Sequence, residues 1–233
     1  MKVSIWSDVR CPFCYIGKHK FEKALEQFPN KSQVEMVWHS FELDPSLRTD
    51  PEKNTLDHLA ESKGISRTQA EEMTQHAVRA AQEVGLELNF DTAVVANSFQ
   101  SHKLIQLANS KNRGNDVKEA LFKAHFSEGL NIDDKETLVQ IGVSKGIDRE
   151  TVEQALDSDD FSSKVRADQK QAQAFGIRGV PYFVFNDKYA VSGAQPTEVF
   201  LEVLEKSWDE FKEGNKIVEL NSGDACSPEG NCD

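Results

Sequence analysis

Hydrophobic residues open the chain in a pattern of strand, helix and strand. Residues 3–6 form a short β-rich run, and apolar residues then recur at helical spacing between Gly17 and Phe28. A second β-rich run, at residues 34–43, is nearly continuously apolar, which is typical of a strand with both faces covered. The opening therefore predicts a β-α-β unit, the beginning of an α/β fold.

Helical spacing then replaces strand character for more than a hundred residues. Ser66 and Gln69 form the sequence pattern of a capping box at the start of one helix, and Gly176 is placed to end the last helix. Apolar periodicity predicts helices around residues 70–84, 99–108, 117–126, 138–141, 152–156 and 161–175. We therefore expect residues 52–176 to form an all-helical insertion.

Strand character returns after this region. The tripeptide Gly179-Val180-Pro181 leads into a β-rich run at residues 182–185. Asn186-Asp187 suits a tight turn, after which residues 189–191 can pair back as a hairpin, and a last amphipathic helix follows. This order predicts a second part of the same sheet.

The predicted elements divide the chain into three parts. Residues 1–51 and 177–215 form one α/β domain, which residues 52–176 interrupt. Residues 216–233 are rich in Asn, Ser, Gly and Asp, and we expect them to form a flexible C-terminal tail.

Charge and composition limit the classes of binding partner that we expect. The chain has 27 basic and 39 acidic residues, a formal charge of −12, which disfavours nucleic acid and anionic membranes as partners. No apolar run is long enough to span a bilayer, and the N-terminus lacks the pattern of a signal peptide. We therefore expect a cytoplasmic protein, and in that compartment cysteine pairs tend to be catalytic, redox-sensing or metal-binding.

The most informative motif is Cys11-Pro12-Phe13-Cys14, between the first strand and the first helix. A helix N-terminus presents free N–H groups and the positive end of the peptide dipoles, which stabilise a thiolate. We expect Cys11 to be the exposed nucleophile and Cys14 the buried resolving thiol. Half of a zinc site and a structural disulfide remain as alternatives.

The second motif is Gly179-Val180-Pro181, placed directly before a strand. The element order matches a thioredoxin-type fold, in which a cis-proline loop faces the cysteine pair, so we expect a cis bond at Pro181. The N–H and C=O groups of Val180 would then pair with an extended substrate. Three aromatic residues are candidates for an apolar surface around Cys11, or else for ordinary core positions: Phe13, Tyr15 and Phe185.

The chain resembles the DsbA family, and within it the FrnE-like cytoplasmic branch. The resemblance rests on S-D-V-R-C-P-F-C-Y-I-G at 7–17, W-H-S-F-E-L-D-P at 38–45, L-F-K-A-H-F-S-E-G at 121–129 and G-V-P-Y-F-V-F at 179–185. It implies a thioredoxin-like fold with a large all-helical insertion and thiol–disulfide exchange by Cys11 and Cys14. Where some thioredoxin-like proteins bury a carboxylate, this chain has Ile5, and two nearby acidic residues are candidates for proton handling: Asp8 and Glu42. The alternatives are a loop or capping role for Asp8 and, for Glu42, a solvent-facing position or a pair with a basic side chain.

A second cysteine pair, Cys226 and Cys232, lies in the predicted tail. We expect it to be a second redox pair that exchanges electrons with Cys11 and Cys14 or with a partner. A passive tail disulfide, dispensable thiols and a four-thiolate zinc site with the first pair are the alternatives.

The sequence thus predicts a thiol–disulfide oxidoreductase or isomerase without a cofactor or a metal. Its expected partners are protein disulfides or dithiols, glutathione and a thioredoxin-type reductant. Two other functions remain open: a glutathione-binding transferase or isomerase of the kappa or 2-hydroxychromene-2-carboxylate isomerase type, and a zinc-bound, redox-regulated binding module.

Overall fold

Four strands form one mixed sheet within residues 1–214, the part of the chain that the computed structural model describes. The strands are β1 (Lys2–Ser7), β2 (Glu35–Ser40), β3 (Tyr182–Phe185) and β4 (Tyr189–Ser192), in the order β2-β1-β3-β4. β1 runs parallel to β2 and antiparallel to β3, and β3 runs antiparallel to β4. The sheet is therefore built from a β-α-β unit and a hairpin that are far apart in the sequence.

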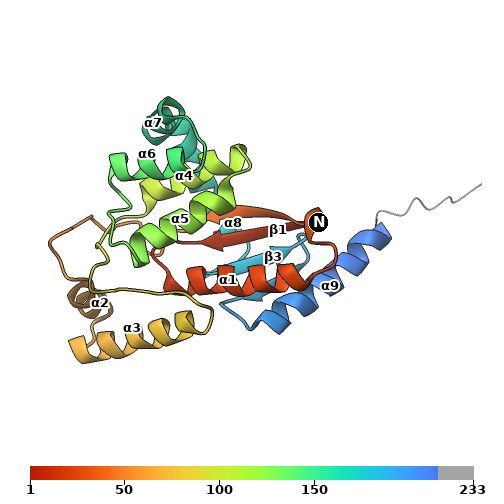
Figure 1. The fold of residues 1–233 in the computed structure, drawn as a ribbon, viewed down its shortest axis with the longest axis horizontal. Helices are drawn as coiled ribbons and strands as arrows, with labels where there is room; N and C mark the ends of the chain where they lie inside the picture. The colour runs from red at the N-terminus through yellow and green to blue at the C-terminus, as the bar shows by residue number, and fades with distance from the viewer. Residues whose placement is uncertain (215–233) are drawn as a thin grey trace, which may run out of the picture.

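One face of the sheet is covered by α1 (Pro12–Gln27) and α9 (Thr197–Gly214), which lie side by side in Figure 1. Phe21 of α1 and Phe200 of α9 meet the ring of Phe183 at centroid distances of 5.5 and 4.7 Å. All three rings are buried. Because aromatic side chains bury large apolar areas, this cluster fixes α1 and α9 on the sheet.

The chain between β2 and β3 forms the helices of the predicted insertion. They are α2 (Thr55–Lys63), α3 (Arg67–Gln82), α4 (Phe99–Ser110), α5 (Gly114–Phe126), α6 (Lys135–Ser144), α7 (Arg149–Asp157) and α8 (Asp159–Ala174). α8 contributes to the other face of the sheet, where the indole N–H of Trp6 donates to the Asp168 carbonyl at 3.2 Å. Figure 1 shows α4 to α7 gathered together above the sheet, with α2 and α3 beside the start of α1. The predicted thioredoxin-like α/β fold with a helical insertion is confirmed, whereas the division into separate domains stays a prediction.

Several local signals in the sequence produce the expected geometry. Ser66 and Gln69 form the capping box of α3, and Gly176 adopts a left-handed φ of 70° just after α8. Asn186 and Asp187 also have positive φ angles, 53° and 57°, and form the turn between β3 and β4. These elements form where predicted because the signals act over a few residues.

One prediction of extent was wrong. β2 ends at Ser40, not at residue 43, because the N–H of Leu43 donates to the side chain of Asp8 at 2.8 Å and not to a neighbouring strand. No separate helix was predicted at α2, which has nine residues of which only Leu56 is buried. Within residues 1–214, no helix is long and apolar enough to cross a membrane.

Candidate active site

The two cysteines of the C-P-F-C motif lie at the junction of β1 and α1. Cys11 is the N-cap of α1 and Pro12 its first residue, where the missing N–H of proline leaves no bond unmade. Both cysteines are free thiols. Cys14 is 1% exposed, as expected, but Cys11 is only 7% exposed, so the expectation of an open nucleophile was wrong.

The loop before β3 covers Cys11. The Val180–Pro181 peptide bond is cis, which confirms the prediction. The thiol of Cys11 donates to the carbonyl oxygen of Val180 at 3.5 Å. Gly17 permits this approach, because a Cβ atom at that position would lie 3.0 Å from Cγ of Pro181. The start of helix α1 and the loop that contains Val180 and Pro181 (the proline loop) are therefore in contact at the sulfur atom of Cys11.

The pKa values of the two thiols are shifted in opposite directions. The pKa of Cys11 is lowered mainly by the hydrogen bond from the Cys14 thiol, and the peptide N–H groups of Cys14 and Phe13 add to the effect against the burial of the sulfur. The pKa of Cys14 is raised well above its ordinary value, mainly by burial and then by its interaction with Cys11. The arrangement thus favours a thiolate on Cys11 and a protonated thiol on Cys14.

A buried lysine from the insertion, Lys118 of α5, also belongs to this site. Its side chain is 1% exposed and forms no ion pair within residues 1–214. Its ammonium group lies 5.5 and 4.9 Å from the ring centroids of Trp38 and Phe122. Burial lowers the pKa of Lys118 from 10.5 to about 8, although Cys14, Asp8 and Cys11 act in the opposite direction. Lys118 was not predicted from the sequence, because a lysine in an amphipathic helix ordinarily faces solvent.

The two candidate proton carriers have other partners. Asp8 is fully buried, and its carboxylate accepts the N–H groups of Arg10 and Leu43 at 3.1 and 2.8 Å. Although burial acts to raise it, the pKa of Asp8 is held well below its usual range by His102, with the Leu43 N–H adding to the effect. Glu42 accepts hydrogen bonds from two side chains of α8, those of Arg166 and Gln169. Asp8 therefore fixes the loop before Cys11, and a role in proton transfer stays a prediction for both.

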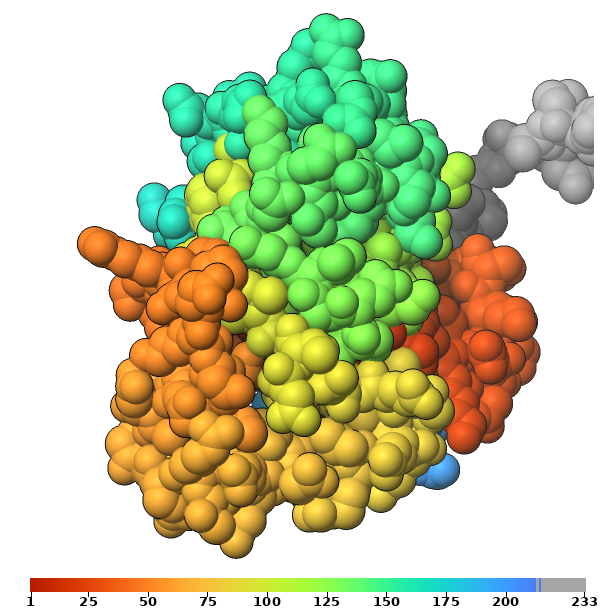
Figure 2. All heavy atoms as spheres, turned by 60° about the vertical axis from the view of Figure 1, so that its left-hand side comes forward, coloured from red at the N-terminus to blue at the C-terminus, as the bar shows by residue number. Residues whose placement is uncertain are grey.

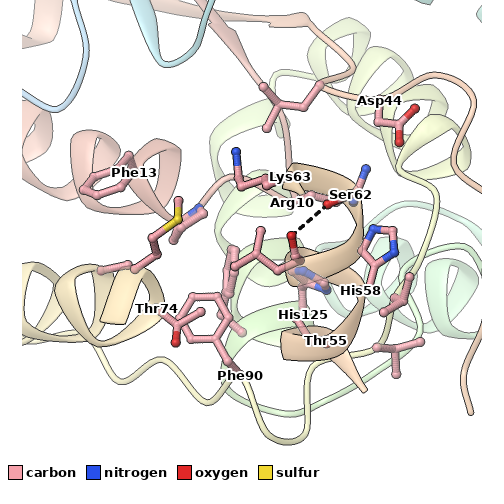
Figure 3. Close-up of a pocket in the computed structure, with 18 residues that line it drawn as sticks. Arg10, Phe13, Asp44, Thr55, His58, Ser62, Lys63, Thr74, Phe90 and His125 are labelled. Atoms are coloured by element: carbon pink, nitrogen blue, oxygen red, sulfur yellow. Dashed lines mark hydrogen bonds between the residues drawn. The ribbon is translucent and has the colours of Figure 1, made fainter. Parts of the chain in front are cut away.

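The three aromatic candidates have different positions. Tyr15 and Phe185 are buried core residues and do not form an apolar surface around Cys11. Phe13 is partly buried, approaches the ring of His76 at 5.8 Å and lines a cavity of about 570 Å³ (Figure 3). Of the three, only Phe13 is placed to meet a ligand.

A polar cluster connects α1 with α5 beside the site. Glu119 accepts the hydroxyl of Tyr15 at 2.8 Å and the ammonium group of Lys18 at 2.6 Å. His19, Glu22 and Glu119 have ligand atoms within 4.8 Å of one another, a spacing that a metal ion can use. However, Lys18 also bonds Glu22 at 2.8 Å, so a cation of the protein already pairs with both carboxylates and offsets one of their two negative charges. Cys226 and Cys232 lie outside the described residues.

Comparisons with known proteins agree with the geometry. The family model of the DSBA-like thioredoxin domain matches residues 2–205. The uncharacterized protein YwbO of Bacillus subtilis is 27% identical over 207 residues, which cover 87% of this chain and 94% of that protein.

Solved structures extend the comparison. The crystal structure of a probable DsbA oxidoreductase from Streptomyces coelicolor has a TM-score of 0.84 and 36% identity, covering 100% of this chain and 98% of that chain. The cytosolic disulfide reductase DsbM from Pseudomonas aeruginosa, solved with GSH, has a TM-score of 0.65 at 17% identity, covering 90% of this chain and 100% of that chain, and at this identity it shows the fold alone. With its thioredoxin-like sheet, its N-terminal cysteine pair and a family match over nearly its whole length, this chain belongs to the DsbA-like thioredoxin domain family.

Proposed function

We propose that the chain is a thiol–disulfide oxidoreductase that uses Cys11 and Cys14. The Cys11 thiolate attacks one sulfur of a substrate disulfide, a mixed disulfide forms, and the other substrate sulfur leaves as a thiol after taking up a proton. Cys14 then loses its proton and attacks the Cys11 sulfur, which releases the second substrate thiol. Two electrons pass to the substrate, and the enzyme keeps a Cys11–Cys14 disulfide; the reverse reaction oxidises a dithiol.

The observation that carries this proposal is a pair of free thiols at the N-terminus of α1, one at the cap and one in the first turn, whose pKa values are shifted in opposite directions. Cys11 caps α1 and has a lowered pKa, whereas Cys14 lies one turn further along and has a raised pKa. Exchange needs one thiolate for attack and a second thiol that reacts only after the mixed disulfide has formed. This difference between the pKa values of the two thiols favours a role in disulfide exchange over a role as a passive structural disulfide.

The same geometry supports a substrate-binding role for the proline loop. Val180 and Pro181 lie against Cys11, and the backbone groups of Val180 can pair with an extended chain as an added strand. Phe13 offers an apolar contact at the same edge of the site. We propose protein disulfides or dithiols as substrates, in the cytoplasm, with glutathione or a thioredoxin-type protein as the reductant. The solved complex of DsbM with GSH supports the inclusion of glutathione.

Cys226 and Cys232 complete the proposal as a second redox pair that exchanges with the first. Replacing both by serine should slow turnover with at least one reductant. If turnover with glutathione and with a thioredoxin-type reductant stays unchanged, the tail pair takes no part in exchange.

The whole proposal can be tested by equilibrating the full chain in glutathione buffers of defined potential and mapping each cysteine by mass spectrometry. We expect a reversible Cys11–Cys14 disulfide, and a mixed disulfide on Cys11 when Cys14 is replaced by alanine. An inert Cys11, or four cysteines that stay reduced around bound zinc, would contradict the proposal and favour the metal-binding alternative. Glutathione binding without any disulfide formation would favour the transferase or isomerase alternative.

A further inference from the structure

A cavity of about 570 Å³ lies beside the start of α1. It is lined by residues from the β1–α1 connection, α1, α2, α3 and α5 and from the segments at 43–44 and 90–95 (Figure 3). In Figure 2, which brings this side forward, the surface is hollowed between α2 (orange) and the segment that precedes α4 (yellow). The volume is that of a site for a small organic molecule. Pro12 and Phe13 form part of the wall, but Cys11 does not, so the cavity lies beside the start of α1 and does not enclose the sulfur.

Much of the wall is apolar. Phe13, Phe90 and Phe126 contribute aromatic surface. Leu43 and Met73, also in the lining, are 49% and 45% exposed, which places them among the large apolar side chains that the fold leaves in contact with water. Exposed apolar side chains gathered in a cavity are typical of a ligand site.

The polar part of the lining includes a cationic side chain with a hydrogen-bond donor that has no acceptor among the described residues. Arg10 and Lys63 both line the cavity, and neither forms an ion pair within residues 1–214. Nη1 of Arg10 is buried and has no hydrogen-bond acceptor among the described residues. A buried donor without an acceptor is costly, and a guanidinium group presents paired N–H donors that match a carboxylate.

The other ionisable side chains of the lining do not supply that acceptor. Asp44 is the single carboxylate among the lining residues; its Oδ1 accepts the N–H and the hydroxyl of Ser46, at 3.0 and 2.7 Å, and it forms no ion pair with Arg10. His125 is buried, and its Nδ1 has no partner among the described residues. Burial lowers the pKa of His125 to about 4, and the charge of Arg10 adds to the effect. Its imidazole is therefore neutral near pH 7 and available for a hydrogen bond to a ligand.

We propose that this cavity binds a small organic carboxylate with an apolar, ring-sized body, and that Arg10 is the partner of the carboxylate group. The rings of Phe13, Phe90 and Phe126 face the body of the ligand, and Lys63 adds positive charge. The site does not rest on the thiol chemistry proposed above, because no cysteine lines it.

The test uses 2-naphthoate as the probe and its neutral amide, 2-naphthamide, as the matched control. Calorimetric titration is done on the full chain with Cys11→Ser and Cys14→Ser, which separates binding from disulfide exchange. We expect 2-naphthoate to bind more tightly than 2-naphthamide. Arg10→Gln should weaken 2-naphthoate roughly tenfold to a hundredfold and leave 2-naphthamide unchanged, because hydrogen bonds to charged groups are stronger than neutral ones.

Two further variants keep the test decisive if Arg10→Gln does not fold. Met73→Glu places a carboxylate on an exposed wall position and should abolish 2-naphthoate binding, and Arg149→Gln, far from the lining on α7, should leave it unchanged. Equal affinity for the acid and the amide, or no binding of either, would overturn the proposal. So would an unchanged affinity for 2-naphthoate in either Arg10→Gln or Met73→Glu.

Discussion

The carbonyl oxygen of Val180 lies 3.5 Å from the sulfur of Cys11 and accepts its thiol hydrogen. This bond favours the protonated thiol, whereas the Cys14 thiol and the peptide N–H groups at the start of α1 favour the thiolate. A substrate strand that donates an N–H to Val180 would engage that carbonyl, so substrate pairing and formation of the thiolate act in the same direction.

Removing the thiol of Cys14 should make Cys11 less acidic. The hydrogen bond from Cys14 is the largest cause of the lowered pKa of Cys11, so Cys14→Ala should raise that pKa. Cys14→Ser keeps a hydrogen-bond donor and should leave the pKa closer to its value in the unaltered chain. Thiolate absorbance followed against pH in the two variants, each with the tail cysteines replaced by serine, measures the difference. Equal titration curves would mean that the helix N-terminus alone sets the acidity.

Lys118→Met should slow the resolving step. The ammonium group of Lys118 lowers the pKa of Cys14, against the larger effect of burial, and methionine fills a similar volume without charge. We expect Cys14 to attack the Cys11–glutathione mixed disulfide severalfold more slowly near neutral pH, because its pKa rises without the ammonium group and a smaller fraction of the thiol is ionised. The first attack by Cys11 should change less. Stopped-flow measurement of both steps, with Lys170→Met at an exposed position of α8 as the control, distinguishes these outcomes.

The same lysine predicts how stability depends on pH. Folding lowers the pKa of Lys118 from 10.5 to about 8, so the unfolded chain binds more protons at this side chain between these two values. Stability therefore rises with pH across that window, by on the order of 3 kcal/mol from this group. Methionine at position 118 carries no proton, so the Lys118→Met variant lacks this pH dependence. The free energy of unfolding of the variant should exceed that of the unaltered chain at pH 8, and the excess should shrink as the pH rises to 10.5. Urea unfolding in a Cys11→Ser/Cys14→Ser background excludes the ionisation of those thiols, and a constant difference would contradict the prediction.

Glu119→Gln should weaken the connection between α1 and α5. Although burial acts to raise it, the pKa of Glu119 is lowered from 4.5 to about 2 by His19, Lys18 and Tyr15. Because the carboxylate is about one-third exposed, we expect a loss of about 1–2 kcal/mol in the free energy of unfolding. A lowered pKa gives stability above pH 4.5 that is lost as pH falls towards 2, so the difference between the two proteins should vanish over that range.

A matched control is Glu136→Gln on the surface of α6. Glu136 pairs with Arg149, and both side chains are at least half exposed. Exposed pairs contribute little to stability, so this variant should unfold at nearly the same urea concentration as the unaltered chain. If the two substitutions have equal effects, the contacts of Glu119 with α1 are no stronger than a surface ion pair.

The sequence was sufficient for the parts of the site that depend on short patterns. Cys11 and Cys14 are recognisable because they follow a strand and open a helix. The element order matches a thioredoxin-type fold, and that match predicts that Pro181 faces them. The burial of Cys11 was not predicted, since it depends on how closely the Val180 loop approaches a helix that has glycine at position 17.

The charged residues around the site could not be found in this way. Lys118 follows Val117 in a predicted helix, and the apolar pattern of that helix does not distinguish a buried lysine that acts on a cysteine from a solvent-exposed one. Arg10 is adjacent to Cys11 in sequence, but its unpaired guanidinium group becomes evident only when α2, α3 and α5 enclose the cavity. Such features depend on contacts between distant segments, which single-sequence patterns do not encode.

Consecutive residues of α5 act on the first two turns of the reactive helix: Lys118 on Cys14, and Glu119 on Tyr15 and Lys18. The sulfur of Cys14 and one of the charges that influence it therefore come from different parts of the chain. In chimeras of two related proteins that exchange only the segment between β2 and β3, the contribution of Lys118 to the acidity of Cys14 should follow the donor of that segment, although both chimeras keep their own C-P-F-C motif. Divergence within the inserted helices can thus retune the chemistry of this family while the motif itself stays unchanged.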